Sequence, residues 1–223
     1  MVKTLDELGI EHGTDKATIY PHGRSHHGYT IKYDEILSPL RDKPIRMLEI
    51  GICMEGSAGG HSVRMWRDYF TKAKLFTFDI VDMSWMESAE EFNGRVSFYQ
   101  GDQSNRNDLS SMFIQYGSKP FDIILEDGSH EHPHQIINLG TAFTYLKSNG
   151  MYLLEDISIP GHPVCCIRND ETYAVLENFI NTGKFVTEHL TQEECEYLEK
   201  NIKTIELSRD NQDAYCVAII TKK

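Results

Sequence analysis

The chain has 223 residues, which is enough for one sizeable hydrophobic core and few for two, so we expect a single domain. Its 22 Lys and Arg residues against 34 Asp and Glu residues give a formal net charge of -12. Nucleic acid and anionic lipid both attract basic surfaces, so this charge argues against either partner. No apolar stretch is of signal-peptide or membrane-spanning type, which predicts a cytoplasmic protein without membrane contact.

The cysteines predict neither metal binding nor redox chemistry. Their number is odd, and no pair has the C-x-x-C spacing that indicates zinc or a redox dithiol. Two of them are adjacent, but neighbouring loop cysteines in a reducing compartment are ordinary thiols. The five are Cys53, Cys165, Cys166, Cys195 and Cys216.

From Ile45 onward, short apolar runs alternate with longer amphipathic runs, which is the pattern of a parallel sheet with crossover helices. The expected strands are Ile45–Ile50, Lys74–Ile80, Val96–Gln100, Phe121–Leu125 and Gly150–Leu154. The expected helices lie near Ser62–Phe70, Asn107–Tyr116 and Gln135–Leu146.

The end of the chain has a different pattern. Two apolar stretches, Thr204–Leu207 and Ala214–Thr221, are separated only by a polar turn that is too short for a crossover helix, so they predict an antiparallel hairpin. Five alternating units and a hairpin resemble the class I methyltransferase fold. This is an α/β, doubly wound, mostly parallel, Rossmann-like sheet of seven strands, in which the last strand lies antiparallel beside the fifth. A nicotinamide-binding domain would continue with a sixth parallel strand.

Residues 1–44 precede the first expected strand and are rich in His and Gly between positions 22 and 28. We expect a loop followed by a helix over Tyr29–Leu40, together forming an N-terminal cap segment over the carboxyl edge of the sheet. A flexible loop is the alternative, because Gly and His are common in solvated loops. The cap belongs to the same domain as residues 45–223, which we expect to form the methyltransferase domain.

The first strand ends in a carboxylate and a glycine-rich turn, Glu49-Ile50-Gly51 followed by residues 52–57. Gly51 would let the backbone approach a ligand closely. The turn lacks the G-x-G-x-x-G fingerprint that cradles a diphosphate, so it suits a cofactor without phosphates. S-adenosylmethionine is such a cofactor, and Glu49 would serve its ammonium group. The alternative is a structural turn with a solvated glutamate.

Further carboxylates follow the second and third strands. Asp79 can accept both hydroxyls of a ribose, and Asp102 is suited to accept from the adenine amino group. Either acid could instead cap a helix, Asp102 in particular because Ser104 follows it. We add Ser57, Gln103 and Asp127 to the expected cofactor-binding residues.

The fourth and fifth strands are each followed by a cluster of acids, in residues 125–130 and 153–156. Neighbouring parallel strands lie about 4.8 Å apart, so these carboxylates converge, and without a cation they would repel one another and be costly to desolvate. Oxygen ligands favour Mg²⁺ or Mn²⁺. His130 is in reach as a general base, or is a loop histidine bonded to the backbone. We expect His132 and His134 at the surface.

Several motifs together resemble the metal-dependent sugar O-methyltransferases of macrolide antibiotic biosynthesis, of the mycinamicin and macrocin type. The resemblance implies that Asp127, Glu155 and Asp156 bind the metal and that His130 is the catalytic base. The motifs are Gly13-Thr14-Asp15-Lys16, Pro39-Leu40-Arg41-Asp42, Leu48-Glu49-Ile50-Gly51, Arg64-Met65-Trp66, Gly101-Asp102-Gln103-Ser104, Asp127-Gly128-Ser129-His130 and Glu155-Asp156. The turn after Gly51 carries less glycine than the family's, and the segment after Pro160 does not match it.

We therefore expect an S-adenosylmethionine- and Mg²⁺- or Mn²⁺-dependent O-methyltransferase that acts on a hydroxyl of a sugar or glycosylated small molecule in natural product biosynthesis. A catechol-type aromatic diol is the nearest alternative acceptor, since the same groups would bind it. A nucleotide-binding oxidoreductase and a non-catalytic binding protein are alternatives on the same fold. The sequence leaves a homo-oligomer open.

Overall fold

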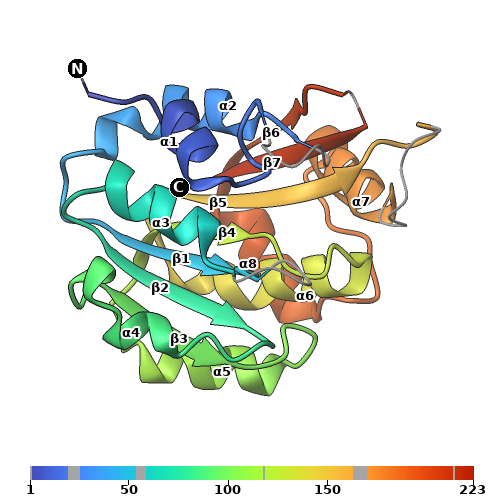
Figure 1. Cartoon of the computed structure of the whole chain (residues 1–223). Helices are drawn as coiled ribbons and strands as arrows, with labels where there is room; N and C mark the ends of the chain where they lie inside the picture. The colour runs from blue at the N-terminus through green and yellow to red at the C-terminus, as the bar shows by residue number, and fades with distance from the viewer. Residues whose placement is uncertain (1, 20–25, 54–58, 118, 163–169, 213) are drawn as a thin grey trace.

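The computed structural model describes residues 2–19, 26–53, 59–117, 119–162, 170–212 and 214–223. Seven strands form one sheet: β1 (Arg46–Ile50), β2 (Lys74–Asp79), β3 (Val96–Gln100), β4 (Phe121–Glu126), β5 (Leu146–Ser158), β6 (Ile202–Arg209) and β7 (Tyr215–Lys222). Their order is β3-β2-β1-β4-β5-β7-β6 (Figure 1). Neighbours from β3 to β5 are parallel, whereas β7 is antiparallel to both β5 and β6. The predicted fold class and the terminal hairpin are confirmed.

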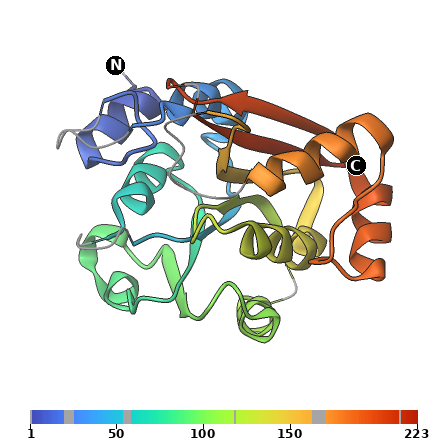
Figure 2. The ribbon, with the colours of Figure 1, turned by 90° about the vertical axis from the view of Figure 1, so that its right-hand side faces the viewer.

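Helices cover both faces of the sheet, giving three layers (Figure 2). One face packs against α1 (Leu5–His12), α2 (Tyr29–Leu37), α3 (His61–Tyr69) and α4 (Trp85–Ser88). The other packs against α5 (Arg106–Gln115), α6 (His132–Ala142), α7 (Asp170–Thr182) and α8 (Gln192–Asn201). Short 3-10 turns occupy Ser38–Leu40, Glu90–Phe92 and Phe143–Tyr145. Among the described residues, no helix has the length and hydropathy that crossing a membrane requires.

Alternation along the strands divides the core between the two helical layers. In β1, Met47 contributes to the cluster under α1–α4, and its neighbour Leu48 contributes to the cluster under α5–α8. In β5, Leu153 and Leu154 divide in the same way. Successive side chains of a strand point to opposite faces. When helices cover both faces of a sheet, the sequence of each strand is therefore a continuous apolar run.

Several elements differ from the sequence prediction. Strand β5 runs over Leu146–Ser158 and is longer than the expected Gly150–Leu154 at both ends. It begins earlier because Leu146 pairs with Phe121 of β4, and it ends later because it continues along β7 past the end of β4. Helix α6 ends at Ala142, and Leu146 already belongs to β5, so the expected helical end at Leu146 was wrong. Helices α1, α4, α7 and α8 were not predicted from the sequence. The capping box of Thr4 and Glu7 at the start of α1 was a readable helix signal.

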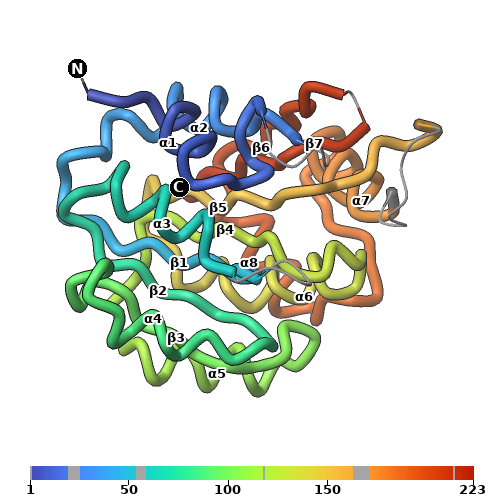
Figure 3. The backbone as a smooth tube through the Cα atoms, viewed as in Figure 1, coloured from blue at the N-terminus to red at the C-terminus, as the bar shows by residue number. Residues whose placement is uncertain are grey.

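The N-terminal segment lies beside the turn of the C-terminal hairpin (Figure 3). The backbone amide of Asn211 donates to the carbonyl of His27 at 2.9 Å, and the side chain of Gln212 donates to the carbonyl of His26 at 3.1 Å. Helices α1 and α2 share the hydrophobic cluster of α3 and the sheet. The N-terminal segment and the turn of the C-terminal hairpin are therefore in contact beyond the carboxyl end of β5.

Gly51 allows the ends of β1 and β4 to approach each other. It has φ +83°, and a Cβ atom there would lie 2.0 Å from the carbonyl oxygen of Asp127. The amide of Asp127 donates to Ile50 O at 2.8 Å, which holds the two strand ends together. The close approach that the sequence predicted therefore involves the backbone of Asp127, in addition to any ligand.

We expect Gly51→Ala to lower the free energy of unfolding by about 3 kcal/mol, because left-handed strain adds to displacement of the Asp127 backbone. Gly94→Ala is the matched control, since Gly94 has φ +65° with no atom within 4 Å of the added Cβ. The control should lose only about 1 kcal/mol. Urea denaturation measures both losses, and equal losses would contradict a close approach at Gly51.

Candidate active site

A cavity of about 740 Å³ opens at the carboxyl ends of β1, β2, β3 and β4. This volume suits a small organic cofactor or substrate. Six of the residues expected at the site line it: Gly51, Asp79, Asp102, Gln103, Asp127 and His130. Glu49, Glu155 and Asp156 are buried next to lining residues, and Ser57 lies outside the described residues. The described part of the predicted site is thus one region.

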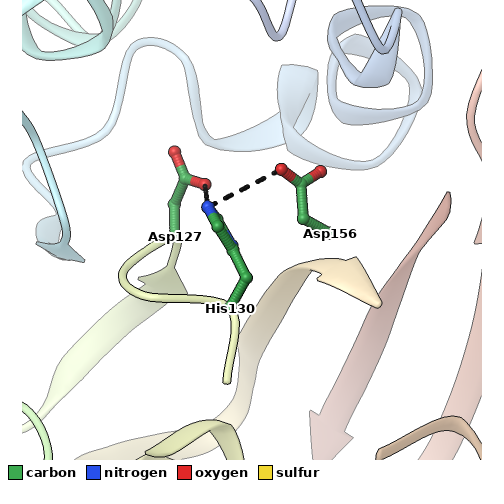
Figure 4. Close-up of side chains that lie close together, drawn as sticks. All are labelled: Asp127, His130 and Asp156. Carbon is green, nitrogen blue, oxygen red and sulfur yellow. Dashed lines mark ion pairs between the residues drawn. The ribbon is translucent and has the colours of Figure 1, made fainter. Parts of the chain in front are cut away.

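Asp127, His130 and Asp156 converge at the rim of this cavity (Figure 4). His130 Nε2 lies 3.9 Å from Asp127 Oδ1 and 3.8 Å from Asp156 Oδ2. One atom from each of the three residues falls within 4.8 Å of the others. Asp127 and His130 follow β4, and Asp156 belongs to β5, so the pairing of these strands brings the acids together.

An irregularity in β5 allows two consecutive acids to reach the same side. The β5–β7 register passes from Leu154↔Ala218 to Ile157↔Cys216, which leaves one extra residue on β5. Asp156 has φ +55°, an uncommon conformation for a residue other than glycine. Bulges of this kind redirect side chains next to functional sites. Glu155 and Asp156 therefore both contact the N-terminal segment instead of pointing to opposite faces.

Two tyrosines of α2 hold these acids. Tyr33 donates its hydroxyl to Glu155 Oε1 at 2.7 Å, and Tyr29 donates to Asp156 Oδ1 at 2.9 Å. Both tyrosines are buried, and their burial raises the pKa of each well above its ordinary value. The nearby carboxylates raise it further. The hydroxyls therefore keep their protons and act as donors.

Lys16 supplies a buried positive charge that sequence analysis did not assign to the site. Its side chain is fully enclosed, and its ammonium group contacts Asp127 Oδ2 and, at 2.7 Å, Glu155 Oε2. Burial alone would lower the pKa of Lys16, but the two carboxylates raise it well above the ordinary value. Lys16 closes the Gly13-Thr14-Asp15-Lys16 motif, and this was the signal in the sequence that could have identified it.

The three acids carry more negative charge than Lys16 can balance. Burial raises the pKa of Asp127 and raises that of Glu155 well above its ordinary value. Burial also acts on Asp156, but His130, His27 and Lys16 together hold the pKa of that carboxyl below the ordinary value. Desolvated carboxylates that share one ammonium are electrostatically unfavourable, so the cluster favours an additional cation.

The donors fit a divalent cation. Asp127 Oδ1, Asp156 Oδ2 and His130 Nε2 face one another, while the opposite oxygen of each aspartate is held by Lys16 or Tyr29. The two carboxylates suit Mg²⁺ or Mn²⁺ with open positions for other ligands, and His130 Nε2 faces the same point. Both oxygens of Glu155 are engaged by Lys16 and Tyr33, although each can accept a further contact.

Asp79 organises the turn after β1. Its Oδ2 accepts from the amides of Ile52 and Cys53 at 2.8 and 2.9 Å, and its Oδ1 accepts from the amide of Val81 at 2.8 Å. A carboxylate with lone pairs left can still accept from a ligand, and Asp79 lines the cavity. Replacing Asp79 would therefore disturb the turn as well as any ribose contact.

Asp102 and Gln103 fix the loops on the other side of the cavity. Asp102 Oδ1 accepts from the amide of Ser104 at 2.8 Å, whereas the N-cap of α5 is Asn105. Gln103 Oε1 accepts from the amide of Ser129 at 3.1 Å, and its Nε2 donates to Glu126 Oε1 at 3.0 Å. Gln103 therefore clamps the loop that carries Asp127 and His130.

Two more buried glutamates lie under the cavity floor. Burial raises the pKa of Glu49 to about 7, although the Lys16 charge opposes the shift. Among the described residues, neither oxygen of Glu49 has a partner at hydrogen-bonding distance. Glu126 is fully buried, and its pKa is also raised to about 7, chiefly by burial. Sequence analysis assigned a role to Glu49 and none to Glu126.

His132 and His134, the two histidines expected at the surface, lie in the interior and at the cavity, respectively. His132 is 5% exposed and bonds Thr172 at 2.9 Å, so its expected surface position was wrong. His134 lines the cavity and bonds Ser129 Oγ at 2.7 Å. Both side chains bond to hydroxyl groups, whereas His130 faces the carboxylates of Asp127 and Asp156.

Known proteins similar to this chain are O-methyltransferases. An 8-demethyl-8-alpha-L-rhamnosyl tetracenomycin-C 2'-O-methyltransferase of Streptomyces olivaceus is 34% identical over 158 residues, 70% of this chain and 38% of that enzyme. A mycinamicin VI 2''-O-methyltransferase of Micromonospora griseorubida is 32% identical over 133 residues, 59% of this chain and 32% of that enzyme. The matched part of the chain thus spans only about a third of the length of these relatives. No protein-family model matches it.

A solved structure has the same fold along nearly the whole chain. The MycE methyltransferase from the mycinamycin biosynthetic pathway, in complex with Mg, SAH and mycinamycin VI, superposes with a TM-score of 0.75 and 25% identity. The match covers 99% of this chain and 54% of MycE. This chain therefore has the class I O-methyltransferase fold and resembles, over about 70% of its length, the sugar O-methyltransferases of antibiotic biosynthesis.

Proposed function

We propose that this chain is an S-adenosylmethionine- and divalent-metal-dependent O-methyltransferase that acts on a sugar hydroxyl of a glycosylated small molecule. The observation that carries the proposal is the convergence of Asp127, His130 and Asp156 at the rim of a cofactor-sized cavity. The MycE structure contains Mg and SAH, and the two relatives are a 2'-O-methyltransferase of a rhamnosyl tetracenomycin-C and a 2''-O-methyltransferase of mycinamicin VI. Mg²⁺ or Mn²⁺ fits the carboxylate oxygens of this site.

The proposed cofactor site follows the carboxyl ends of β1, β2 and β3. Glu49, Gly51, Asp79, Asp102, Gln103 and Asp127 are the described residues that we assign to it, together with Ser57. Within the same domain, we assign residues 1–44 to a cap and residues 45–223 to the catalytic part. Support for one domain comes from the hydrophobic cluster that Leu5 and Tyr33 share with Met47 and Leu125.

The proposed mechanism rests on how the carboxylates and His130 face one point. Asp127 and Asp156 would hold the metal through the oxygens that face His130, with Glu155 as the third ligand. When bound, a divalent cation lowers the pKa of a hydroxyl and orients it. His130 would accept the hydroxyl proton at Nε2, so that the hydroxyl oxygen could bond to the methyl carbon of S-adenosylmethionine while the carbon–sulfur bond breaks and S-adenosylhomocysteine leaves. Much of the rate enhancement would come from in-line positioning.

A methyl-transfer assay with labelled S-adenosylmethionine tests the function. The panel should contain a rhamnosylated aromatic polyketide, a macrolide carrying a deoxysugar, and a simple catechol. Each sugar acceptor is paired with a control whose sugar hydroxyls are already methylated. We expect label on a free sugar hydroxyl and none on the blocked controls. Label on the catechol alone would show that the acceptor is an aromatic diol and not a sugar. No transfer to any acceptor would contradict the proposal.

Removal of the metal should abolish turnover, because the carboxylates alone cannot acidify the acceptor hydroxyl. Dialysis against EDTA should stop label transfer, and Mg²⁺ or Mn²⁺ should restore it, while calorimetry should show S-adenosylhomocysteine still bound. Asp156→Asn should reproduce the loss, whereas the exposed Asp42→Asn should not. Full turnover in protein whose metal content is verified as nil would exclude a metal-dependent reaction.

His130→Ala should slow turnover by about 10²- to 10⁴-fold if His130 is the general base. Affinities for Mn²⁺ and S-adenosylhomocysteine should stay within a few-fold of the wild type. His134→Ala, a cavity histidine bonded to Ser129 instead of facing the carboxylates, should lose far less. A folded His130→Ala protein with near-normal turnover contradicts the base assignment, and one that loses Mn²⁺ makes His130 a metal ligand.

Glu49→Gln should stabilise the protein at high pH and weaken cofactor binding. The pKa of Glu49 is about 7 in the folded protein and 4.5 for an unperturbed glutamate, so ionisation costs stability progressively between those values and fully above pH 7. Urea denaturation should show that the advantage of Glu49→Gln over the wild type, in free energy of unfolding, is larger at pH 8 than at pH 5 by roughly 1 to 3 kcal/mol. The exposed Glu188→Gln is the control. A stability change independent of pH would contradict the buried charge.

A further inference from the structure

His27 belongs to the histidine-rich part of the N-terminal segment, and the proposed reaction does not use it. Its ring is buried, 6% exposed, between two carboxylates. Nε2 lies 3.6 Å from Asp156 Oδ1, and Nδ1 lies 3.1 Å from Asp210 Oδ2. The imidazole thus connects a proposed metal ligand with an acid of the C-terminal hairpin.

Asp210 is itself held in place by the turn of the hairpin. Its Oδ1 accepts from the backbone amides of Gln212, Ala214 and Tyr215 at 3.2, 3.0 and 3.3 Å. The side chain is fully enclosed. The turn therefore fixes one oxygen of Asp210 and directs the other at His27.

The His27 ring and backbone are held on several sides. The ring stacks on Tyr29 with centroids 5.0 Å apart and planes 10° apart, and meets the edge of Tyr215 at 5.6 Å. Its amide donates to Asp15 O at 2.9 Å, and its carbonyl accepts from the Asn211 amide at 2.9 Å. Few conformations of His27 are compatible with all of these contacts.

Gly28 permits the close contact between this segment and the hairpin turn. It has φ +72°, and a Cβ atom there would lie 2.0 Å from the side-chain nitrogen of Asn211. A larger residue would push the segment away from the turn. The Gly–His composition of this region thus has a structural reason at positions 27 and 28.

The two oxygens of Asp156 face different surroundings. Oδ1 faces Tyr29 and His27, whereas Oδ2 faces His130. Asp156 lies in the β5 bulge with φ +55°, so regular strand geometry does not set its side-chain direction. Outside contacts on Oδ1 are therefore needed to keep Oδ2 directed at the site.

We propose that His27, oriented by Asp210, is a positioning residue that directs the Asp156 carboxylate toward the divalent cation. The inference rests on the proposed function, because it assumes that Asp156 is a metal ligand. Partners outside the ligand shell orient the ligands of protein metal sites, and their loss typically lowers metal affinity about 10- to 100-fold. Here the chain of contacts runs from the hairpin turn through Asp210 and His27 to Asp156.

The test measures Mn²⁺ affinity from the electron paramagnetic resonance signal of the free ion, in the full chain. His27→Phe keeps a ring to stack on Tyr29 and removes both nitrogens, and should weaken Mn²⁺ binding about 10- to 100-fold. Asp210→Asn keeps the Oδ1 acceptor for the turn and should weaken binding less. His27→Gln, which restores a side-chain donor, should recover part of the affinity. Calorimetric affinity for S-adenosylhomocysteine should be unchanged in all three.

Gln212→Ala is the matched control, because it removes a hydrogen bond between the same two segments, to His26 O. It should bind Mn²⁺ like the wild type. Circular dichroism in EDTA shows whether each variant is folded. If His27→Phe does not fold, the Mn²⁺ affinity of Asp210→Asn decides the result. Wild-type Mn²⁺ affinity in the folded variants, or an equal loss in Gln212→Ala, would overturn the positioning role. A wild-type protein that binds no Mn²⁺ would overturn the proposed function and this role with it.

Discussion

The site depends on one electrostatic constraint, the burial of several carboxylates at the carboxyl ends of β4 and β5. Asp127, Glu155 and Asp156 are largely withdrawn from water, and the ammonium group of Lys16 balances part of their charge. Isolated charges are not stable in such surroundings, so each carboxylate must find a donor or a cation. The tyrosines of α2 and the lysine of the N-terminal segment supply these partners, and the bulge in β5 lets Glu155 and Asp156 both reach them.

The N-terminal segment is accordingly part of the site and more than a cover for it. Lys16 contacts two of the acids directly, and Tyr29 and Tyr33 contact one each. Through His27, the same segment reaches the hairpin turn at the other end of the sequence. Stability and site geometry are coupled in this arrangement, because separating the segment from the sheet would leave the buried carboxylates without their donors.

Much of the fold and the edge of the cavity could be predicted from the sequence, because the ends of the strands of a parallel sheet can be recognised there. The apolar runs ending in Gly51, Asp79 and Asp127 located the cavity edge, and the short polar turn before Ala214 identified the hairpin. The contacts of Lys16, His27 and Asp210 could not be predicted, since they join residues far apart in the chain, although a sequence motif did mark Lys16. The side-chain directions of Glu155 and Asp156 depend on a bulge whose extra residue has no sequence signature of its own. The roles of Asp79 and Gln103 in holding loops were likewise hidden, because they involve backbone amides.

Anomalous diffraction from crystals grown with Mn²⁺ and S-adenosylhomocysteine would test the proposed metal site most directly. We predict one Mn²⁺ peak between Asp127 Oδ1 and Asp156 Oδ2, with ligand distances of about 2.1 Å, close to the octahedral Mg²⁺ value. The cofactor product should occupy the cavity lined by Asp79 and Asp102. Crystals with ordered S-adenosylhomocysteine but no Mn²⁺ peak at these carboxylates, or with the peak elsewhere on the chain, would contradict this site.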